Sequence, residues 1–206
     1  MLSEDEIATN YAAALETATR FFMGEADVQK AARRIAAALR DIGVPYAIAG
    51  GLAVAAHGHL RVTVDVDVLL TPEGLARFKR QWLGRGWVER FTGSRGLRDA
   101  ELNVRVDVLV TGDFPGDGLP KPVAFPDPSV AAAEIDGTAI LTLPALVELK
   151  VASGLTSPDR LQDFADVIAL VRANRLTLEF AAEIDPYVRD KYCELWGHAQ
   201  IRRDED

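Results

Sequence analysis

The sequence contains very little cysteine and no long apolar segment. Cys193 is the single cysteine among 206 residues, so an internal disulfide is excluded and a reducing compartment is expected. No apolar run approaches the roughly 20 residues that a membrane-spanning helix needs. The acidic start over residues 1–6 is not followed by an apolar signal segment. We therefore expect a cytoplasmic protein that does not associate with membranes.

Positive charge is also in short supply. Lysine and arginine total 23 against 31 aspartates and glutamates, which gives a net charge of −8. A protein that grips long nucleic acid usually has a basic surface, because phosphate contacts dominate that affinity. The composition argues against general binding of duplex DNA, although a local basic patch would still allow a nucleic-acid substrate. A mononucleotide remains compatible, because bound metal ions can neutralise both acidic side chains and phosphates.

Apolar residues, in contrast, are plentiful. They make up 49% of the chain, which is enough for a real core, and the length suits one domain with a helical addition. Alternating patterns over 62–70 and 102–110 predict strands, and Asp136-Gly137 predicts a hairpin turn. We expect an α+β protein with a mixed β-sheet flanked by helices. Its expected parts are N-terminal helices over 1–43, an α/β core over 44–142 and a helical part over 143–200.

Loops are predicted where glycine, proline and aspartate accumulate. The segment 92–99 is expected to be a turn or loop. The segment 111–128 is expected to be a long loop with one short strand near Val123.

Two aspartates on the strongest predicted strand are the first candidate site. Side chains alternate along a strand, so Asp65 and Asp67 point the same way, with Cα atoms about 6.6 Å apart. Two carboxylates at that span can share a pair of divalent ions about 3.5–4 Å apart. Asp107 is a third acid between valines, and the three converge if the two strands are neighbours. Clustered carboxylates repel one another, and Mg²⁺ is the natural counter-ion. The alternative is a solvated acidic face of an amphipathic strand.

A glycine pair precedes these acids by about fifteen residues. Gly50-Gly51 stands between a short apolar strand predicted over 44–49 and a short helix predicted over 52–57. Glycine allows close approach of a ligand to the backbone, and the start of a helix offers free N–H groups to a phosphate. Alone, the pair would indicate only a tight turn. Followed by a short helix and an acid-x-acid strand, it is a more specific signal.

The order of these features resembles a known signature. The stretch AIAGGLAVAAHGHLRVTVDVDVLL resembles that of the nucleotidyltransferase superfamily that includes DNA polymerase β. More narrowly, it resembles the small bacterial MNT and AbiEii-like members. The spacing of Arg61, Thr63, Asp65 and Asp67 and the later segment LPALVELKVASGLTSPDRLQDFADVIAL are similar to the AbiEii-like branch. The resemblance covers about residues 44–172.

The resemblance implies a minimal nucleotidyltransferase fold and a two-metal transfer. In that family, Gly50 and Gly51 would hold the triphosphate of an NTP. Asp65, Asp67 and Asp107 would be the catalytic residues and the ligands of Mg²⁺ or Mn²⁺. The implied reaction moves an NMP from an NTP to an acceptor and releases pyrophosphate.

Two basic residues have two interpretations each. Lys150 either contacts the β- or γ-phosphate or forms an ion pair with Asp163 or Asp166 on the next helix, and the two roles could alternate. Arg61 either contacts phosphate or pairs with an acid. We include both in the predicted nucleotide-binding set with Gly50 and Gly51.

The acceptor stays open. RNA, a protein hydroxyl and a small molecule all remain candidates, and the related branches suggest a role as a toxin–antitoxin component. The alternative function is a catalytically silent nucleotide-binding or regulatory module of the same fold. The presence of all three acids argues against a silent module.

Overall fold

The computed structural model describes residues 27–156 and 158–201. Helical residues 27–41 come first, and a mixture of strands and helices follows as far as residue 141. The first part continues with β1 (Ala47–Ile48), α2 (Gly50–Ala56), β2 (Asp65–Leu70), α3 (Pro72–Trp82), β3 (Trp87–Glu89), β4 (Leu97–Asp99), β5 (Arg105–Val110), α4 (Pro128–Ala131), β6 (Ala132–Ile135) and β7 (Thr138–Leu141). The second part consists of α5 (Leu143–Gly154), η1 (Pro158–Arg160), α6 (Leu161–Asn174), η2 (Leu178–Glu183) and α7 (Pro186–Gln200).

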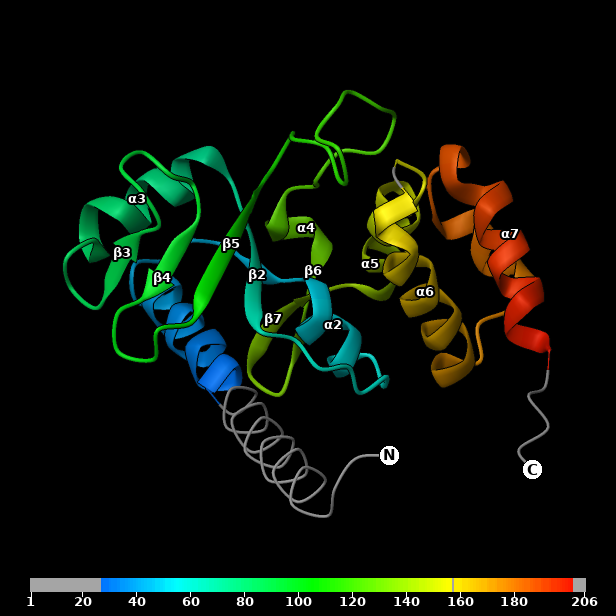
Figure 1. Cartoon of the computed structure of the whole chain (residues 1–206), viewed down its shortest axis with the longest axis horizontal. Helices are drawn as coiled ribbons and strands as arrows, with labels where there is room; N and C mark the ends of the chain where they lie inside the picture. The colour runs from blue at the N-terminus through cyan, green and yellow to red at the C-terminus, as the bar shows by residue number, and fades with distance from the viewer. Residues whose placement is uncertain (1–26, 157, 202–206) are drawn as a thin grey trace, which may run out of the picture.

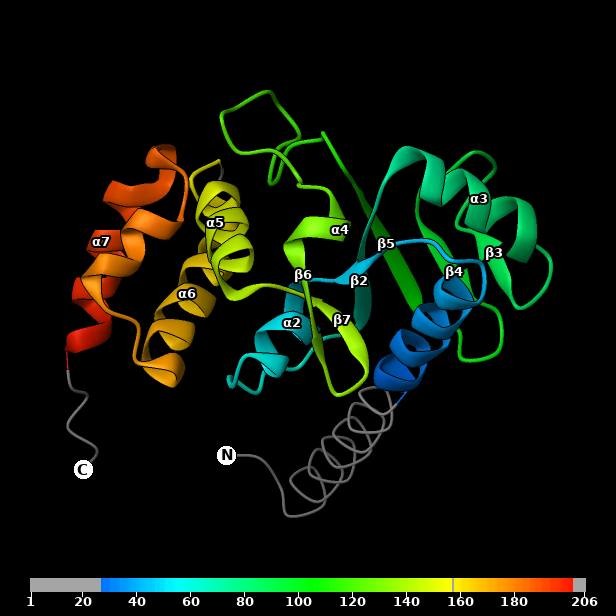
Figure 2. The same cartoon turned by 180° about the vertical axis from the view of Figure 1, so that it is seen from behind.

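The strands form one mixed seven-stranded sheet in the order β3-β4-β5-β2-β1-β7-β6. The central pair, β2 and β5, is parallel, as is the pair β1 and β7, and the other pairs are antiparallel. Helices α5, α6 and α7 gather at one end of the molecule, and β3, β4 and α3 lie at the other (Figures 1 and 2). The α+β class with a mixed sheet flanked by helices is therefore confirmed.

The hydrophobic pattern explains why β2 and β5 are central. Val66, Val68 and Val106 have no exposed surface, because they pack into the core. The residues between them on each strand are polar and remain partly exposed. This period of two turns one face of both strands inward and leaves the other face able to carry charged side chains.

Helix α5 connects the sheet to the helical end. Leu146, Val147 and Val151 are buried in the core, and the helix packs against both α6 and α7. A helix that is apolar on most of its surface is stable only when it is covered on several sides. The single basic residue in its second half, Lys150, is therefore buried too.

Two loop predictions are wrong in part. The segment 92–99 contains β4, which pairs with both β3 and β5. Its Leu97 is buried, and its Asp99 is buried in an ion pair with Arg34 at 2.7 Å. These tertiary contacts stabilise a strand that glycine-rich composition concealed. Near Val123 no strand forms among the described residues, although Val123 itself is buried.

The predicted N-terminal helices lie partly outside the described residues, and the division of the chain at residues 43 and 142 stays a prediction. The hairpin predicted around Asp136-Gly137 is present as β6 and β7. In the part of the chain that the structure describes, no helix has the length and apolar character needed to cross a membrane.

Candidate active site

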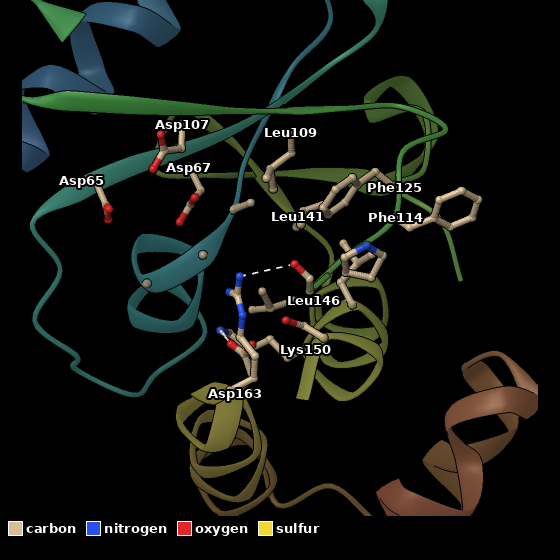
Figure 3. A pocket seen from close by; sticks show the side chains of 18 of the residues that line it. Asp65, Asp67, Asp107, Leu109, Phe114, Phe125, Leu141, Leu146, Lys150 and Asp163 are labelled. Carbon is tan, nitrogen blue, oxygen red and sulfur yellow. Dashed lines mark hydrogen bonds and ion pairs between the residues drawn. The ribbon is translucent and has the colours of Figure 1, made fainter. Parts of the chain in front are cut away.

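The three predicted acids come together on the central strand pair. β2 and β5 run parallel in a register that places Asp67 opposite Asp107 and Asp65 opposite Arg105. Residues paired in this way have side chains on the same face of a sheet. The three carboxylates accordingly lie side by side at one end of a cavity (Figure 3). The structure thus satisfies the condition that the two acidic strands are neighbours.

The glycine pair lies directly against these acids. Gly50 opens α2 with a φ of +57°, in the region that favours glycine. A Cβ atom at Gly50 would lie 1.8 Å from Oδ2 of Asp67, and one at Gly51 would lie 2.9 Å from Cβ of Thr63. Both positions therefore require the absence of a side chain. The backbone of the Gly50 turn is in immediate contact with the Asp67 carboxylate.

Asp67 is the electrostatic centre of the cluster. Burial, and then the negative charges of Asp65 and Asp107, raise the pKa of the Asp67 carboxyl from 3.8 to about 6. The nearby charges of Lys150 and Arg61 lower the same pKa, but they do not cancel the increase. Among the described residues, no side chain donates a hydrogen bond to the Asp67 carboxylate. A partly buried carboxylate with like charges on both sides favours a proton or a cation.

The two flanking acids, in contrast, have cationic partners. Arg105 donates to Oδ2 of Asp65 at 3.0 Å, and Thr63 donates to Oδ1 of the same carboxylate at 3.0 Å. Arg90 donates to Oδ1 of Asp107 at 2.8 Å. These ion pairs are partly exposed, with side-chain exposures between 23% and 41%.

The predicted basic residues lie across the cavity, in a network with α6. Lys150 contacts Asp163 at 2.8 Å and Asp166 at 2.7 Å, and Arg61 contacts Asp166 at 2.9 Å. Gln162 donates to the second oxygen of Asp166, which has no exposed surface. The ion-pair interpretation of Lys150 and Arg61 is therefore what the structure shows. Their contact with phosphate stays a prediction.

All the predicted site residues line one cavity of about 580 Å³. They come from α2, the loop between α2 and β2, the β2–β5 pair and α5. Figure 3 shows the acids of the β2–β5 pair on one side of the cavity and Lys150 of α5 on another. The predicted set is Gly50, Gly51, Arg61, Asp65, Asp67, Asp107 and Lys150. The volume is in the range of small-molecule sites in proteins, about 300–1,000 Å³.

Apolar side chains gather at the other end of the cavity. Leu109, Phe114 and Phe125 line it, together with Leu141 and Leu146. In Figure 3, Phe114 and Phe125 lie at the far end from the acids, with Leu109 between. The cavity thus joins a charged end to an apolar end, which suits a ligand with the same asymmetry.

The donor set fits a hard divalent cation, but the present side-chain arrangement does not close around one. Carboxylate oxygens are the ligands that Mg²⁺ and Mn²⁺ prefer. Within residues 27–156 and 158–201, no group of three His, Cys, Asp or Glu side chains is placed to hold a metal ion. The outer carboxylates, Asp65 and Asp107, are engaged with arginines instead. Metal binding by the three acids therefore stays a prediction.

Sequence reasoning missed four residues of this region. Arg105 had a signal, because it stands two residues before Asp107 and so shares its face. Arg90 had no such signal, because it follows β3 and meets Asp107 of β5 only through the tertiary fold. Phe114 and Phe125 come from the long loop over 111–128, where no hydrophobic period indicates orientation.

Known proteins resemble this chain in structure rather than in sequence. No protein-family model matches the sequence, and no curated protein matches it significantly. Among solved structures, ANT(2")-Ia in complex with adenylyl-2"-tobramycin has a TM-score of 0.51 at 14% identity, over 77% of this chain and 92% of that one. A candidate nucleotidyltransferase from H. pylori has a TM-score of 0.50 at 16% identity, over 85% and 93% of the two chains. The chain has the fold of these proteins, which confirms the predicted nucleotidyltransferase fold and leaves the MNT and AbiEii-like branch a prediction.

Proposed function

We propose that this protein is a metal-dependent nucleotidyltransferase that moves an NMP from an NTP to an acceptor. One observation carries the proposal. Asp65, Asp67 and Asp107 share a face of two paired strands, directly against the Gly50 turn, inside a cavity large enough for a nucleotide. The raised pKa of Asp67 supports the same interpretation, because this carboxylate has like charges around it and no bound partner among the described residues.

Each group has a role in that reaction. The backbone of Gly50 and Gly51 would accept the triphosphate, since no side chain keeps it from the cavity. Asp65 and Asp67 would hold two divalent ions, and Asp107 would hold one and orient the acceptor hydroxyl. When bound, such ions neutralise phosphate charge and stabilise the attacking and leaving oxygens of an in-line displacement. The new bond joins the acceptor oxygen to the α-phosphorus, and pyrophosphate leaves.

Lys150 and Arg61 would contribute positive charge to the phosphate end. Both line the cavity, and both lie near enough to Asp67 to lower its pKa. In the present structure their partners are Asp163 and Asp166. We propose that Lys150 exchanges Asp163 for a phosphate oxygen when nucleotide binds.

The apolar end of the cavity would accept the nucleobase. Phe114 and Phe125 offer aromatic faces, and bases stack on aromatic side chains with little dependence on their identity. This arrangement would place the triphosphate toward the glycines and leave the acids between nucleotide and acceptor.

The compound held by ANT(2")-Ia gives independent support for the reaction class. It is an adenylylated tobramycin, in which a nucleotidyl group is joined to an acceptor. For the present chain, the acceptor stays open among RNA, a protein hydroxyl and a small molecule. A toxin–antitoxin role, a cytoplasmic location and the choice of Mg²⁺ over Mn²⁺ also stay predictions.

The second candidate function is a silent nucleotide-binding module. The engagement of Asp65 and Asp107 with arginines favours it, because these pairs oppose metal binding. The two functions differ in one product. An active enzyme releases pyrophosphate when it is given NTP, metal and the right acceptor, and a silent module binds NTP without releasing any.

The decisive experiment supplies each of the four NTPs, labelled at the α-phosphate, with Mg²⁺ or Mn²⁺ and a cell lysate as the source of acceptors. Label on an RNA, a protein or a small molecule, with stoichiometric pyrophosphate, supports transfer. Asp67→Asn is the control and should give neither. Metal-dependent NTP binding without transfer from any lysate would favour the silent module, and no binding of NTP would contradict both functions.

A second measurement separates the two ends of the cavity. ATP and inorganic tripolyphosphate should both bind, and ATP should bind more tightly because of base stacking worth about 1–3 kcal/mol. Phe114→Ala should lower the affinity for ATP and leave the affinity for tripolyphosphate unchanged. Phe91→Ala is a matched control, since Phe91 is exposed and does not line the cavity. Equal losses for both ligands would contradict the placement of the base.

A further inference from the structure

Two arginines engage the outer acids of the cluster. Arg105 donates to Asp65 at 3.0 Å, and Arg90 donates to Asp107 at 2.8 Å. Neither arginine contacts Asp67, which stands between these pairs. The cluster therefore consists of two compensated carboxylates around an uncompensated one.

The fold brings both guanidinium groups close to the acids. Arg105 on β5 is in register with Asp65 on β2, so the two side chains are neighbours on one face. Arg90 comes from the end of β3 and passes the Gly96 position to reach Asp107. A Cβ atom at Gly96 would lie 2.8 Å from Cδ of Arg90 and 3.6 Å from Oδ1 of Asp107. The route of Arg90 thus depends on the missing side chain at Gly96.

These pairs bear directly on metal binding. A carboxylate oxygen that accepts from a guanidinium has part of its charge neutralised and one lone-pair direction filled. A divalent ion approaching the same oxygen also meets the repulsion of the guanidinium charge. Consistent with this, no three acids of the described residues are placed to hold a metal in the present arrangement.

We propose that Arg90 and Arg105 are positioning residues that hold Asp107 and Asp65 in the metal-free protein and must be displaced by divalent ions. This inference rests on the proposed function, because it requires that the three acids bind metal. The arginines compensate two of the three charges until metal arrives. They lower metal affinity as a result, and their release presents two guanidinium groups beside the loaded site.

The experiment measures Mn²⁺ affinity rather than activity, from the EPR signal of free Mn²⁺ in titrations without nucleotide. Arg105→Ala and Arg90→Ala should each bind Mn²⁺ about two- to fivefold more tightly than the wild type, which is the size of a partly exposed ion pair. The double variant should show roughly the product of the two changes. Arg105→Lys, which keeps the charge, should stay near the wild type.

The matched control is Arg98→Ala. Arg98 lies on β4, but its guanidinium donates to the amide oxygen of Asn103 and, within the described part of the chain, pairs with no acid. Its removal should leave Mn²⁺ affinity unchanged. A purely structural role for Arg90 and Arg105 predicts the opposite sign, since loosened carboxylates would bind Mn²⁺ more weakly. Thermal melts in EDTA show whether each variant is folded. Arg90→Gln or Arg105→Gln replaces the corresponding alanine variant if that variant is not folded.

The outcomes separate this inference from the proposed function. If the wild type binds Mn²⁺, Asp67→Asn does not, and both arginine variants match the wild type, the inference fails and the proposed function stands. If the arginine variants bind Mn²⁺ and the wild type does not, the inference is supported in its strongest form. If no folded variant binds Mn²⁺ at millimolar concentration, both the inference and the metal-dependent function fail.

Discussion

The two charged walls of the cavity differ in how their charges are compensated. On the wall formed by α5 and α6, every charge has a partner: Lys150 contacts two acids, and Asp166 accepts from Lys150, Arg61 and Gln162. On the wall formed by β2 and β5, Asp67 has no such partner among the described residues, and its pKa is raised. The charges of the α5–α6 wall compensate one another, whereas the β2–β5 wall keeps one uncompensated carboxylate.

This difference indicates which wall depends on a ligand. A buried network with all its hydrogen bonds satisfied rigidifies the fold and needs nothing further. A carboxylate with raised pKa beside two others is stabilised by adding positive charge. The acidic wall is therefore where a cation or a metal-bound phosphate gains most. The α5–α6 wall contributes positive charge to ligand binding only if one of its ion pairs opens.

The largest expected effect on stability comes from removing a buried carboxylate of the α5–α6 wall. Asp166→Ala removes the fully buried carboxylate that Lys150 and Arg61 share, so that Lys150 keeps only Asp163 and the partly exposed Arg61 loses its acid. Removing one partner of a buried ion pair typically costs about 3–5 kcal/mol of stability. Urea denaturation followed by circular dichroism measures the change. Asp190→Ala, an exposed aspartate on α7, is the control and should change stability by less than about 0.5 kcal/mol. A loss of stability below about 1 kcal/mol for Asp166→Ala would contradict the conclusion that the charges of the α5–α6 wall stabilise the fold.

Removing a carboxylate charge from the β2–β5 wall should have the opposite effect and stabilise the protein. The folded-state pKa of Asp67, about 6, exceeds the ordinary value of 3.8, so the folded state binds this proton more tightly than the unfolded state does. Ionised Asp67 therefore destabilises the protein, fully above about pH 6 and hardly at all below pH 3.8. Asp67→Asn removes this cost and should stabilise the metal-free protein by about 2–3 kcal/mol at about pH 7.5.

The pH series supplies the control for Asp67→Asn. The stability difference from the wild type should shrink as pH falls from about 7.5, and most of it should be gone at about pH 4. The variant should also lose nucleotidyl transfer. A variant that is less stable than the wild type at the higher pH, or equally active, would show that the carboxylate is not an uncompensated metal ligand.

The acidic wall could be predicted from the sequence because it follows strand periodicity. Asp65 and Asp67 are two residues apart between valines, so their common direction needs no tertiary information. The convergence of Asp107 required only that two strongly patterned strands be neighbours. Gly50 was identified by its position in the motif, and its contact with Asp67 gives the physical reason for glycine there.

The remaining contacts could not be predicted, because nothing local determines them. Arg90 reaches Asp107 across β4, which composition indicated as loop. Arg61 finds Asp166 across more than a hundred residues, and helix periodicity placed Asp166 on a shared face with Asp163 without saying which of the two is buried. The aromatic end of the cavity depends on the path of a long irregular loop.

A moderate effect should distinguish the two roles of Lys150. Lys150→Met keeps the apolar stem in the core, and Arg61 and Gln162 still compensate Asp166. Stability should fall by about 1–3 kcal/mol, less than for Asp166→Ala. If Lys150 also reaches phosphate, NTP affinity should fall by about 10- to 150-fold, as for a lost charged hydrogen bond of about 1.5–3 kcal/mol. Unfolding curves and NTP titrations of the same variant separate the two effects.

The control for Lys150→Met is tripolyphosphate. Its affinity should fall by the same factor as that of ATP if Lys150 contacts the phosphates, because the two ligands share the triphosphate group. Unchanged affinity for both ligands would remove Lys150 from the nucleotide-binding set and leave it a structural residue.

The smallest effect is expected for the partner that Lys150 can give up. Asp163 has 16% side-chain exposure and, among the described residues, pairs only with Lys150, whereas Asp166 is fully buried with three donors. Asp163→Asn should therefore change stability by less than about 1 kcal/mol. It should leave NTP affinity unchanged or raise it a few-fold, since Lys150 then loses a competitor for phosphate. Equal destabilisation by Asp163→Asn and Asp166→Asn in urea melts, or weaker NTP binding by the former, would show that Lys150 does not exchange partners.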